Sequence, residues 1–363
     1  MKFRHATSAM ALAVSALLGS TNLARADVPD VVVSIKPLHS LVAGVMAGVG
    51  KPTLLMDGAS SPHSFSLKPS QARALEQADR VFWIGEEIET FLVKPVETIV
   101  GKGKATALID ANGIRKLPFR DGATFESHDH AKHDDHGHED HGHKDHEHDE
   151  HAHEEHAHEE HGHEEHGHEE HAHEDREHGD HHEGHESAHS EHDAHIWLDP
   201  ENAKAIVAEV ARVLSDADAE NADAYRTNAQ DVQARLDDLL AETASSLDGL
   251  ADKHFVVFHD AYQYFETRFG LEAVGALTLN PEITPGADRL KEIRTKLTSL
   301  EAACVFAEPQ FEPALVDVVI EGTAARSGVI DPLGSALEAG PDQYFGLIRN
   351  MAGSIRSCLS ESS

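Results

Sequence analysis

The side chains of this sequence that could do chemistry gather in one long segment, residues 126–193, built mainly from histidine, aspartate and glutamate. The segment contains 25 of the 31 histidines of the chain, and its 26 acidic and 3 basic residues give it a net charge of −23. Imidazole and carboxylate groups are ligands that zinc and related divalent ions accept in proteins. The segment therefore predicts a protein that handles metal ions, with zinc favoured.

The same segment is not expected to fold by itself. It has no apolar residue larger than alanine, so it cannot bury enough surface to offset the entropy lost on ordering. Within it, His185-Glu-Ser-Ala-His189 formally fits the HExxH motif of zinc proteases, but that motif needs a packed helix with apolar neighbours. A segment made mostly of histidine and glutamate produces the string by chance. We therefore predict that the protein is not an enzyme.

The histidines outside this segment and the N-terminus are few enough to weigh one by one: His39, His63, His195, His254 and His259. His63 lies in a predicted loop, and His195 begins a short apolar run. His259 directly follows the buried run 255–258, and Asp331 follows the run 329–330 in the same way. Open α/β sheets bind ligands outside the carboxyl ends of their strands, which favours His259 and Asp331 as ligands.

Three imidazoles and one carboxylate would make a tetrahedral zinc site. Spacing alone does not bring these four residues together. Each histidine could equally be a surface or capping residue, and Asp331, which precedes Pro332, could be a plain turn residue.

The elements that must position these residues alternate between short β-runs and helices, which is typical of α/β domains with parallel sheets. We expect strands at residues 31–35, 81–84, 255–258, 304–306 and 329–330, and a short strand or edge at 195–198. Asp199 and Pro200 indicate the start of a helix that reaches about residue 214. Apolar residues at helical spacing between 219 and 247, with no Gly or Pro, predict one helix about 40 Å long.

This pattern predicts two Rossmann-like α/β lobes with parallel sheets, joined by a long rigid helix, with the metal site in the crevice between the lobes. The N-terminal lobe would span residues 27–218 and include the 126–193 insert. The linking helix would span 219–248, and the C-terminal lobe 249–363.

The N-terminus has the features of an export signal. Lys2 and Arg4 precede an apolar run, residues 9–18, that is too short to span a bilayer, and Ala24-Arg25-Ala26 offers a cleavage site. Residues 1–26 are therefore predicted to be a signal peptide. With no later transmembrane run and no cysteine at the cleavage site to carry a lipid, we expect a soluble protein in a bacterial periplasm.

Net charge and cysteine content narrow the partners and the chemistry further. The formal charge of −35 argues against nucleic acid and anionic membrane surfaces, because both would repel the protein. Cys304 and Cys358 are the two cysteines of the chain. In an oxidising compartment such a pair is a candidate disulfide, and two unpaired buried thiols are the alternative.

Several motifs resemble the ZnuA family of solute-binding proteins, which serve high-affinity zinc ABC importers and belong to a wider cluster of metal-binding transport receptors. Four of them lie in the C-terminal half: Phe258-His-Asp-Ala-Tyr-Gln-Tyr-Phe265, Asn280-Pro-Glu-Ile-Thr-Pro-Gly286, Cys304-Val-Phe-Ala-Glu-Pro-Gln310 and Asp331-Pro-Leu-Gly334. Two lie before it: Ser61-Pro-His63 through Lys68-Pro69-Ser70, and His195-Ile-Trp-Leu-Asp-Pro200. The likeness covers essentially the whole mature chain.

The resemblance implies a ligand set of His63, His195 and His259, with Asp331 at the position of a carboxylate found in related receptors. Some zinc receptors have a glutamate before the first histidine, and this chain has Pro62 there, which leaves Asp331 or a water as the fourth ligand. The resemblance also implies that Cys304 and Cys358 are paired. His39 and His254 match no ligand position and are interpreted as a helix-start residue and a surface residue.

The implied activity is non-catalytic. A monomeric receptor would capture zinc between its lobes and dock on a membrane permease, whose ATPase subunit supplies the energy. Manganese receptors of the same cluster use two histidines and two carboxylates, so His259 favours zinc. The alternatives are a receptor for manganese or another divalent metal, and a periplasmic metal buffer in which the insert does most of the binding.

Overall fold

In the computed structural model of the protein, residues 28–101, 103–120, 125, 192–300 and 302–360 are described. The predicted signal peptide and nearly all of the predicted histidine-rich insert lie outside the described residues. The described residues belong to one compact unit.

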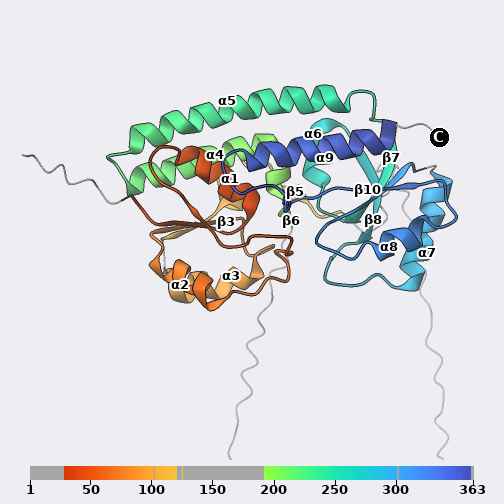
Figure 1. Ribbon diagram of the computed structural model, residues 1–363, viewed down its shortest axis with the longest axis horizontal. Coiled ribbons are helices and arrows are strands. Elements are labelled where there is room, and N and C mark those ends of the chain that lie inside the picture. The colour runs from red at the N-terminus through yellow and green to blue at the C-terminus, as the bar shows by residue number, and fades with distance from the viewer. Residues whose placement is uncertain (1–27, 102, 121–124, 126–191, 301, 361–363) are drawn as a thin grey trace, which may run out of the picture. The chain divides into compact units, whose positions relative to one another are not determined.

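Two four-stranded parallel sheets form the framework (Figure 1). The N-terminal sheet has the order β2-β1-β3-β4, with β1 at Val31–Val33, β2 at Thr53–Leu54, β3 at Arg80–Trp83 and β4 at Ala105–Ala107. The C-terminal sheet has the order β10-β9-β7-β8, with β7 at His254–His259, β8 at Glu272–Thr278, β9 at Cys304–Ala307 and β10 at Arg326–Val329. All six strand pairs in these sheets are parallel, which confirms the predicted fold class.

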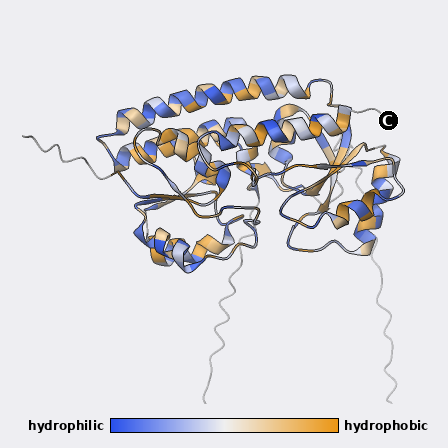
Figure 2. Ribbon diagram, in the orientation of Figure 1, coloured by the Kyte–Doolittle hydropathy of each residue, from blue (hydrophilic) through white to orange (hydrophobic). Residues whose placement is uncertain are grey.

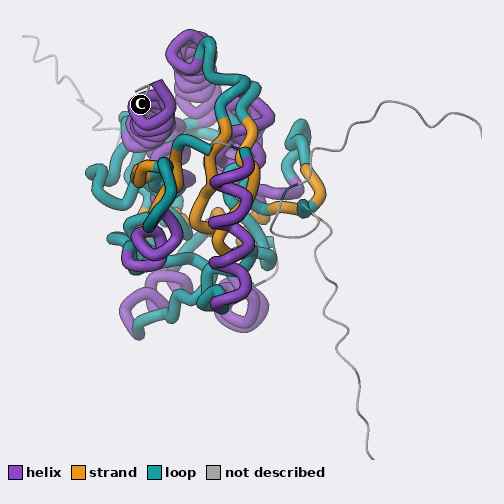
Figure 3. The backbone as a smooth tube through the Cα atoms, turned by 90° about the vertical axis from the view of Figure 1, so that its right-hand side faces the viewer, coloured by secondary structure: helices purple, strands orange, loops and turns teal. Residues whose placement is uncertain are grey.

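Helices cover both faces of each sheet, as buried parallel strands require. The helical segments that connect or follow the strands of the first sheet are α1 (Lys36–Val45), α2 (Pro69–Gln77), α3 (Thr90–Pro95), the π-helical turn η1 (Val96–Val100) and the 3₁₀ turn η2 (Leu108–Asp110). The second sheet carries α6 (Gln263–Phe269), α7 (Ala287–Ser299), α8 (Ala314–Ile320) and α9 (Gln343–Ser360). Figure 3 shows this layering from the side, with helices on either side of the strands.

Two helices connect the halves. Asp199 caps α4 (Pro200–Ala217) as predicted, since its side chain accepts a hydrogen bond from the backbone N–H of Glu201. The predicted long helix is α5 (Ala222–Leu247), and its 26 residues span about 39 Å. Figure 1 shows α5 running along one side of both sheets, with α9 beside it.

One apolar core extends through both halves, on the faces of the two sheets that α1, α4, α5 and α9 cover. It contains inward residues of β1 and β3, the packed faces of α1, α4 and α5, and inward residues of β7, β9 and α9. Two smaller cores lie on the opposite faces of the sheets, one under α2 and α3 and one under α7 and α8. Figure 2 shows hydrophobic and hydrophilic residues alternating along α5, as expected for a helix with one buried face. The two lobes therefore share a core on the side that α5 and α9 cover. They are separate only on the opposite side, which we call the front.

Some predicted elements were wrong in type or length. Residues 196–198 form a 3₁₀ turn, η3 (Ile196–Leu198), because no strand pairs with them and the chain turns directly into α4. The last two residues of the predicted insert, His192 and Asp193, form β6, which pairs antiparallel with β5 (Leu117–Pro118). The strand expected at 329–330 ends at Val329 and begins earlier, at Arg326. No helix among the described residues is long and apolar enough to cross a membrane.

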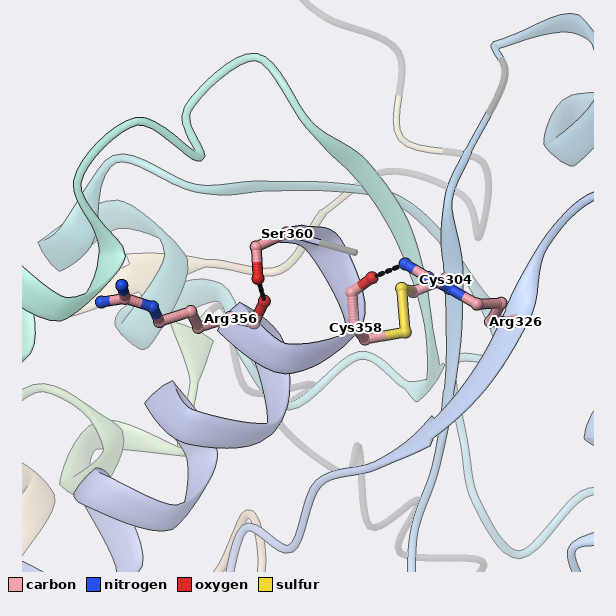
Figure 4. Close-up of a disulfide and its surroundings, with 5 residues drawn as sticks. All are labelled: Cys304, Arg326, Arg356, Cys358 and Ser360. Atoms are coloured by element: carbon pink, nitrogen blue, oxygen red, sulfur yellow. Dashed lines mark hydrogen bonds between the residues drawn. A yellow bond between two sulfur atoms is a disulfide. The ribbon is translucent and has the colours of Figure 1, made fainter. Parts of the chain in front are cut away.

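The expected disulfide is present. Cys304, the first residue of β9, is bonded to Cys358 in the last turns of α9, with the two Cα atoms 6.2 Å apart. Figure 4 shows that Arg326 of β10 donates a hydrogen bond to the carbonyl of Cys358 beside this link. The disulfide and this bond attach the end of α9 to the two edge-most strands on that side of the sheet.

Candidate metal centre

Three of the predicted ligands meet at the front of the molecule, between the two sheets. His63 lies in the loop between β2 and α2, His195 directly precedes η3, and His259 is the last residue of β7. One possible ligand atom of each lies within 4.8 Å of those of the other two. Their ring centroids are 5.4 to 5.8 Å apart. A single metal ion could therefore contact all three imidazoles.

Two of the three histidines are held by buried carboxylates. Nδ1 of His195 lies 2.7 Å from Oδ1 of Asp193, and Nδ1 of His259 lies 2.7 Å from Oε1 of Glu308. When the carboxylate is ionised it can only accept, so Nδ1 donates its hydrogen and the lone pair of the neutral ring is on Nε2. Burial raises the pKa of Asp193 to about 7, so its pair with His195 takes this form above that pH. This arrangement is typical of metal-binding histidines, whose second nitrogen is fixed by a carboxylate.

The strand register explains the second of these pairs. Strands β7 and β9 pair in parallel, with Phe255 opposite Cys304 and Val256 opposite Val305. Continuing this register places His259, the last residue of β7, opposite Glu308, which directly follows β9. Glu308 is 2 % exposed, so its charge is shielded from water and acts strongly on His259.

His63 is held differently. It lies on a loop, its backbone N–H donates to Oγ of Ser61, and its Nε2 is buried without a hydrogen-bond partner. Nε2 of His259 is likewise buried without a partner. Buried polar atoms without partners are rare and need an explanation, and a metal ion would supply it here.

Burial controls the protonation of this cluster. Burial, with smaller contributions from His195 and His259, lowers the pKa of His63 to about 2. Burial, followed by His259, also lowers the pKa of His195 well below its usual value. Burial acts in the same direction on His259 and is the largest single effect, but Glu308, Asp260 and Asp193 together outweigh it and the pKa of His259 is raised. The cluster thus has two neutral imidazoles ready for metal and one that binds a proton more readily.

The walls around the histidines are mainly apolar. Besides the three histidines, Glu308 and Gln310, the pocket is lined by Ser61, Pro62, Trp197, Phe311, Pro332 and Leu333. The ring of Phe311 stacks on Phe258 and packs edge-on against His259, with centroids 4.8 and 5.9 Å apart. Such a lining restricts water, which strengthens electrostatic interactions inside the pocket.

Comparison with known proteins identifies the group of proteins to which this architecture belongs. The model of the family described as "Zinc-uptake complex component A periplasmic", ZnuA, matches residues 31–358. The chain belongs to the ZnuA family. Among curated ZnuA proteins, each named "High-affinity zinc uptake system protein ZnuA", it is 52 % identical to that of Brucella suis over 331 residues, 91 % of this chain and 92 % of the relative. It is 36 % identical to that of Yersinia pestis over 359 residues, 96 % of each chain.

Solved structures agree on the fold. A crystal structure of ZnuA superposes with a TM-score of 0.67 and 21 % identity, covering 92 % of this chain and all of that one. The periplasmic zinc-binding protein TroA of Treponema pallidum superposes with a TM-score of 0.65 and 18 % identity, covering 91 % and 99 %. At these identities the likeness concerns the two-lobed fold alone.

Asp331, the predicted fourth ligand, does not join the close group of histidines. Its Oδ1 accepts hydrogen bonds from the backbone N–H of Leu333 and the side chain of Gln310. Its Oδ2 accepts from the backbone N–H and the hydroxyl of Ser335. In this structure of a ZnuA-family chain, Asp331 organises the loop after β10, and its role as a ligand stays a prediction.

Sequence reasoning missed the two carboxylates. Asp193 was assigned to the low-complexity insert, although it is buried and belongs to β6. Glu308 lies in one of the motifs that resemble the ZnuA family but received no role. Its position directly after the buried run 304–307, at the carboxyl end of a strand, was a usable signal.

The two remaining histidines stay outside the cluster. His39 lies in the first turn of α1, where its Nε2 is 3.1 Å from the carbonyl of Pro52. His254 begins β7, at the strand end opposite His259. Neither is in the one group of potential metal ligands found among the described residues.

Proposed function

We propose that this protein is a periplasmic receptor that captures Zn²⁺ and delivers it to the permease of an ABC importer, whose ATPase subunit supplies the energy. The observation that supports this most strongly is the convergence of three histidine nitrogens within 4.8 Å in a buried pocket. The curated relatives with which the chain shares most of its length are named as high-affinity zinc uptake proteins. Zinc is the cargo of such a receptor, and the protein is not an enzyme.

The ligand chemistry favours zinc over harder ions. His63, His195 and His259 would each offer a nitrogen, and zinc accepts imidazole nitrogen in a tetrahedral site that leaves one position open. Manganese and calcium prefer oxygen ligands, which this histidine cluster does not supply. The carboxylates Asp193 and Glu308 would orient two of the rings and make the nitrogen that faces the metal more basic, and so a stronger ligand.

The fourth position is open to Asp331 or to a water. Asp331 would have to give up hydrogen bonds from its own loop and from Gln310 to reach the ion. Replacing it with asparagine tests its part: a ligand role predicts a loss of zinc affinity comparable to that of His259→Ala, whereas a loop role predicts a smaller loss. Affinity is measured by competition with a fluorescent zinc chelator.

Release to the permease would involve small movements of the front of the lobes. The core shared through α1, α5 and α9 would resist a wide hinge motion, because opening it would expose buried apolar surface. We propose that the receptor acts as a monomer. The histidine-rich insert would hold further zinc ions weakly and raise their supply near the pocket.

The deciding experiment measures zinc stoichiometry and affinity of the full chain and of three variants. Deletion of residues 127–189 spares β6 and Asp193 and should leave one tight zinc. His259→Ala should lose most of the tight affinity. His254→Ala, at the other end of the same strand, is the matched control and should bind as the wild type does.

A metal buffer is the competing function, and the 25 histidines of the insert favour it. It predicts that the deletion abolishes tight binding and that His259→Ala leaves it intact. That pair of results would overturn the receptor proposal. Equal affinity for Mn²⁺ and Zn²⁺ in the deletion variant would instead overturn the choice of zinc.

A further inference from the structure

The loop that follows β10, residues 331–337, forms one wall of the histidine pocket. Pro332 and Leu333 line the pocket beside the three histidines. Asp331 holds the start of the loop from within, through its bonds to Leu333 and Ser335. The position of this wall relative to the N-terminal lobe must come from contacts that cross between the lobes.

Lys36 makes two of these contacts. It is the first residue of α1 in the N-terminal lobe, and it is 5 % exposed, which is unusual for a lysine. Its Nζ lies 2.9 Å from the carbonyl oxygen of Ser335 and 3.1 Å from that of Leu337. It also lies 2.9 Å from Oδ1 of Asp57. An ammonium group has three hydrogens to donate, and each has an acceptor here.

The third acceptor connects Lys36 to the loop of His63. Asp57 lies just after β2 and stands six residues before His63, and its Oδ1 also accepts the backbone N–H of Gly58. Among the described residues, the ring of His63 has no carboxylate partner comparable to Asp193 or Glu308, so its position depends on its loop. One ammonium group therefore joins the loop that carries His63 to the loop that walls the pocket.

The anchor itself is rigid. Helix α1 is buried along most of its length and packs against α5 and α9. A second bond between the lobes supports the same wall, since Nε1 of Trp197 donates to the carbonyl oxygen of Pro332 at 2.8 Å. Trp197 stands two residues after His195, so the wall is tied to the surroundings of two of the three histidines.

We infer that Lys36 is a positioning residue that slows the escape of the captured ion by holding the His63 loop and the 331–337 loop together across the pocket. This inference rests on the proposed zinc site. Lys36 does not touch the ion and acts through His63 and the pocket wall. Release would require the bonds from Lys36 to Ser335 and Leu337 to open.

The test is the rate at which the full chain, loaded with one equivalent of Zn²⁺, releases its slowest ion to an excess of chelator. Lys36→Met keeps the stem and removes the ammonium. It should speed release by about tenfold, the scale of losing one charged hydrogen bond. Lys204→Met, which removes a partly exposed lysine paired with Glu201 and Asp237 on α4 and α5, is the control and should leave the rate unchanged.

A double variant separates positioning from general loosening. In a His63→Ala background the loop has no ligand to place, so Lys36→Met should accelerate release by a smaller factor than in the wild-type background, through the 331–337 wall alone. An equal acceleration in both backgrounds would overturn the inference. A wild-type chain that holds no tight zinc would instead refute the proposed function, so the two failures can be told apart.

A measurement on the wild-type chain covers the case in which Lys36→Met fails to fold. Amine-reactive labelling followed by mass spectrometry reports how often Lys36 becomes accessible. Zinc should slow the labelling of Lys36 but not that of Lys204. Labelling of Lys36 that is the same with and without zinc would contradict its part in holding the ion.

Discussion

At the scale of single residues, the three histidines are not equivalent. His195 and His259 are fixed by Asp193 and Glu308, while His63 depends on its loop. Buried carboxylates that are not themselves candidate ligands therefore fix the orientation of two of the three histidine rings. The third is set by backbone that Lys36 helps to hold.

The carboxylates can be tested by neutral replacements. Asp193→Asn and Glu308→Gln keep the shape of the side chain but remove the charge that holds the Nδ1 hydrogen. We expect each to lower zinc affinity by about 10- to 100-fold, the usual effect of losing such a partner. Glu242→Gln, in an exposed ion pair with Arg349, is the control for loss of charge. Unchanged affinity in Glu308→Gln would show that the bond to His259 is structural only.

The protonation of the cluster predicts the pH dependence of binding. The pKa values of His63 and His195 are lowered by burial, so these rings stay neutral, whereas the pKa of His259 is raised by Glu308 against the effect of burial. Zinc must displace a proton from His259 at any pH below that raised pKa. We expect the logarithm of the affinity to fall by about one unit per pH unit in that range and to level off above it. A slope near three in titrations at several pH values would contradict this, because it would mean that all three rings protonate.

At the scale of elements, parallel strand ends bring the site together. β7 delivers His259 and β9 delivers Glu308 to the same edge of the C-terminal sheet, while the opposite end of β9 carries the disulfide. Glu308 stands four positions after Cys304, a distance of about 13 Å at the rise of a β-strand. Stability and metal binding therefore depend on opposite ends of one strand.

Replacing Cys358 with serine should separate these two properties. The disulfide joins residues 54 apart in sequence, and closing such a loop is worth roughly 4 kcal/mol in the chain-entropy model. We expect the free energy of unfolding, measured with denaturant, to fall by about that amount. Zinc affinity should stay within about threefold of the wild type. A loss of affinity as large as that of His259→Ala would show that the disulfide end of β9 governs the ligand end.

At the scale of the whole described part, the two lobes share one core. Residues of β1 and α1 belong to the same buried cluster as residues of β7, β9 and α9, with α5 between them. Lobes with separate cores would be free to rotate about a hinge. A shared core instead favours small motions of the loops at the front, where His63, Asp331 and Lys36 lie.

This predicts one cooperative unfolding transition for the two lobes. Calorimetry of the 127–189 deletion variant should show a single transition whose van't Hoff and calorimetric enthalpies agree. Zinc should raise its midpoint, because the ion binds the folded state. Two separate transitions, with only one shifted by zinc, would show that the lobes unfold independently.

Local features of the sequence are enough to predict metal handling and much of the framework. The histidine-rich insert indicated metal handling, the apolar runs before His259 and Asp331 marked strand ends, and the spacing between 219 and 247 marked the long helix. These features are local: composition and periodicity report which residues are buried in which element, within a few residues of the chain. The same local logic misread 196–198, where a short apolar run fits a strand and a turn equally well.

Only the tertiary structure decided which side chains meet. Glu308 lies beside His259 because β9 pairs with β7 in a register that offsets the two by 49 residues, and no local pattern contains that number. Asp193 belongs to an acidic tract in the sequence, but it is a buried partner of His195 because β6 pairs with β5. Asp331 turned toward its own loop, and Lys36 toward Ser335, about 300 residues away. Contacts between distant segments are set by strand order and packing, which depend on the whole chain at once.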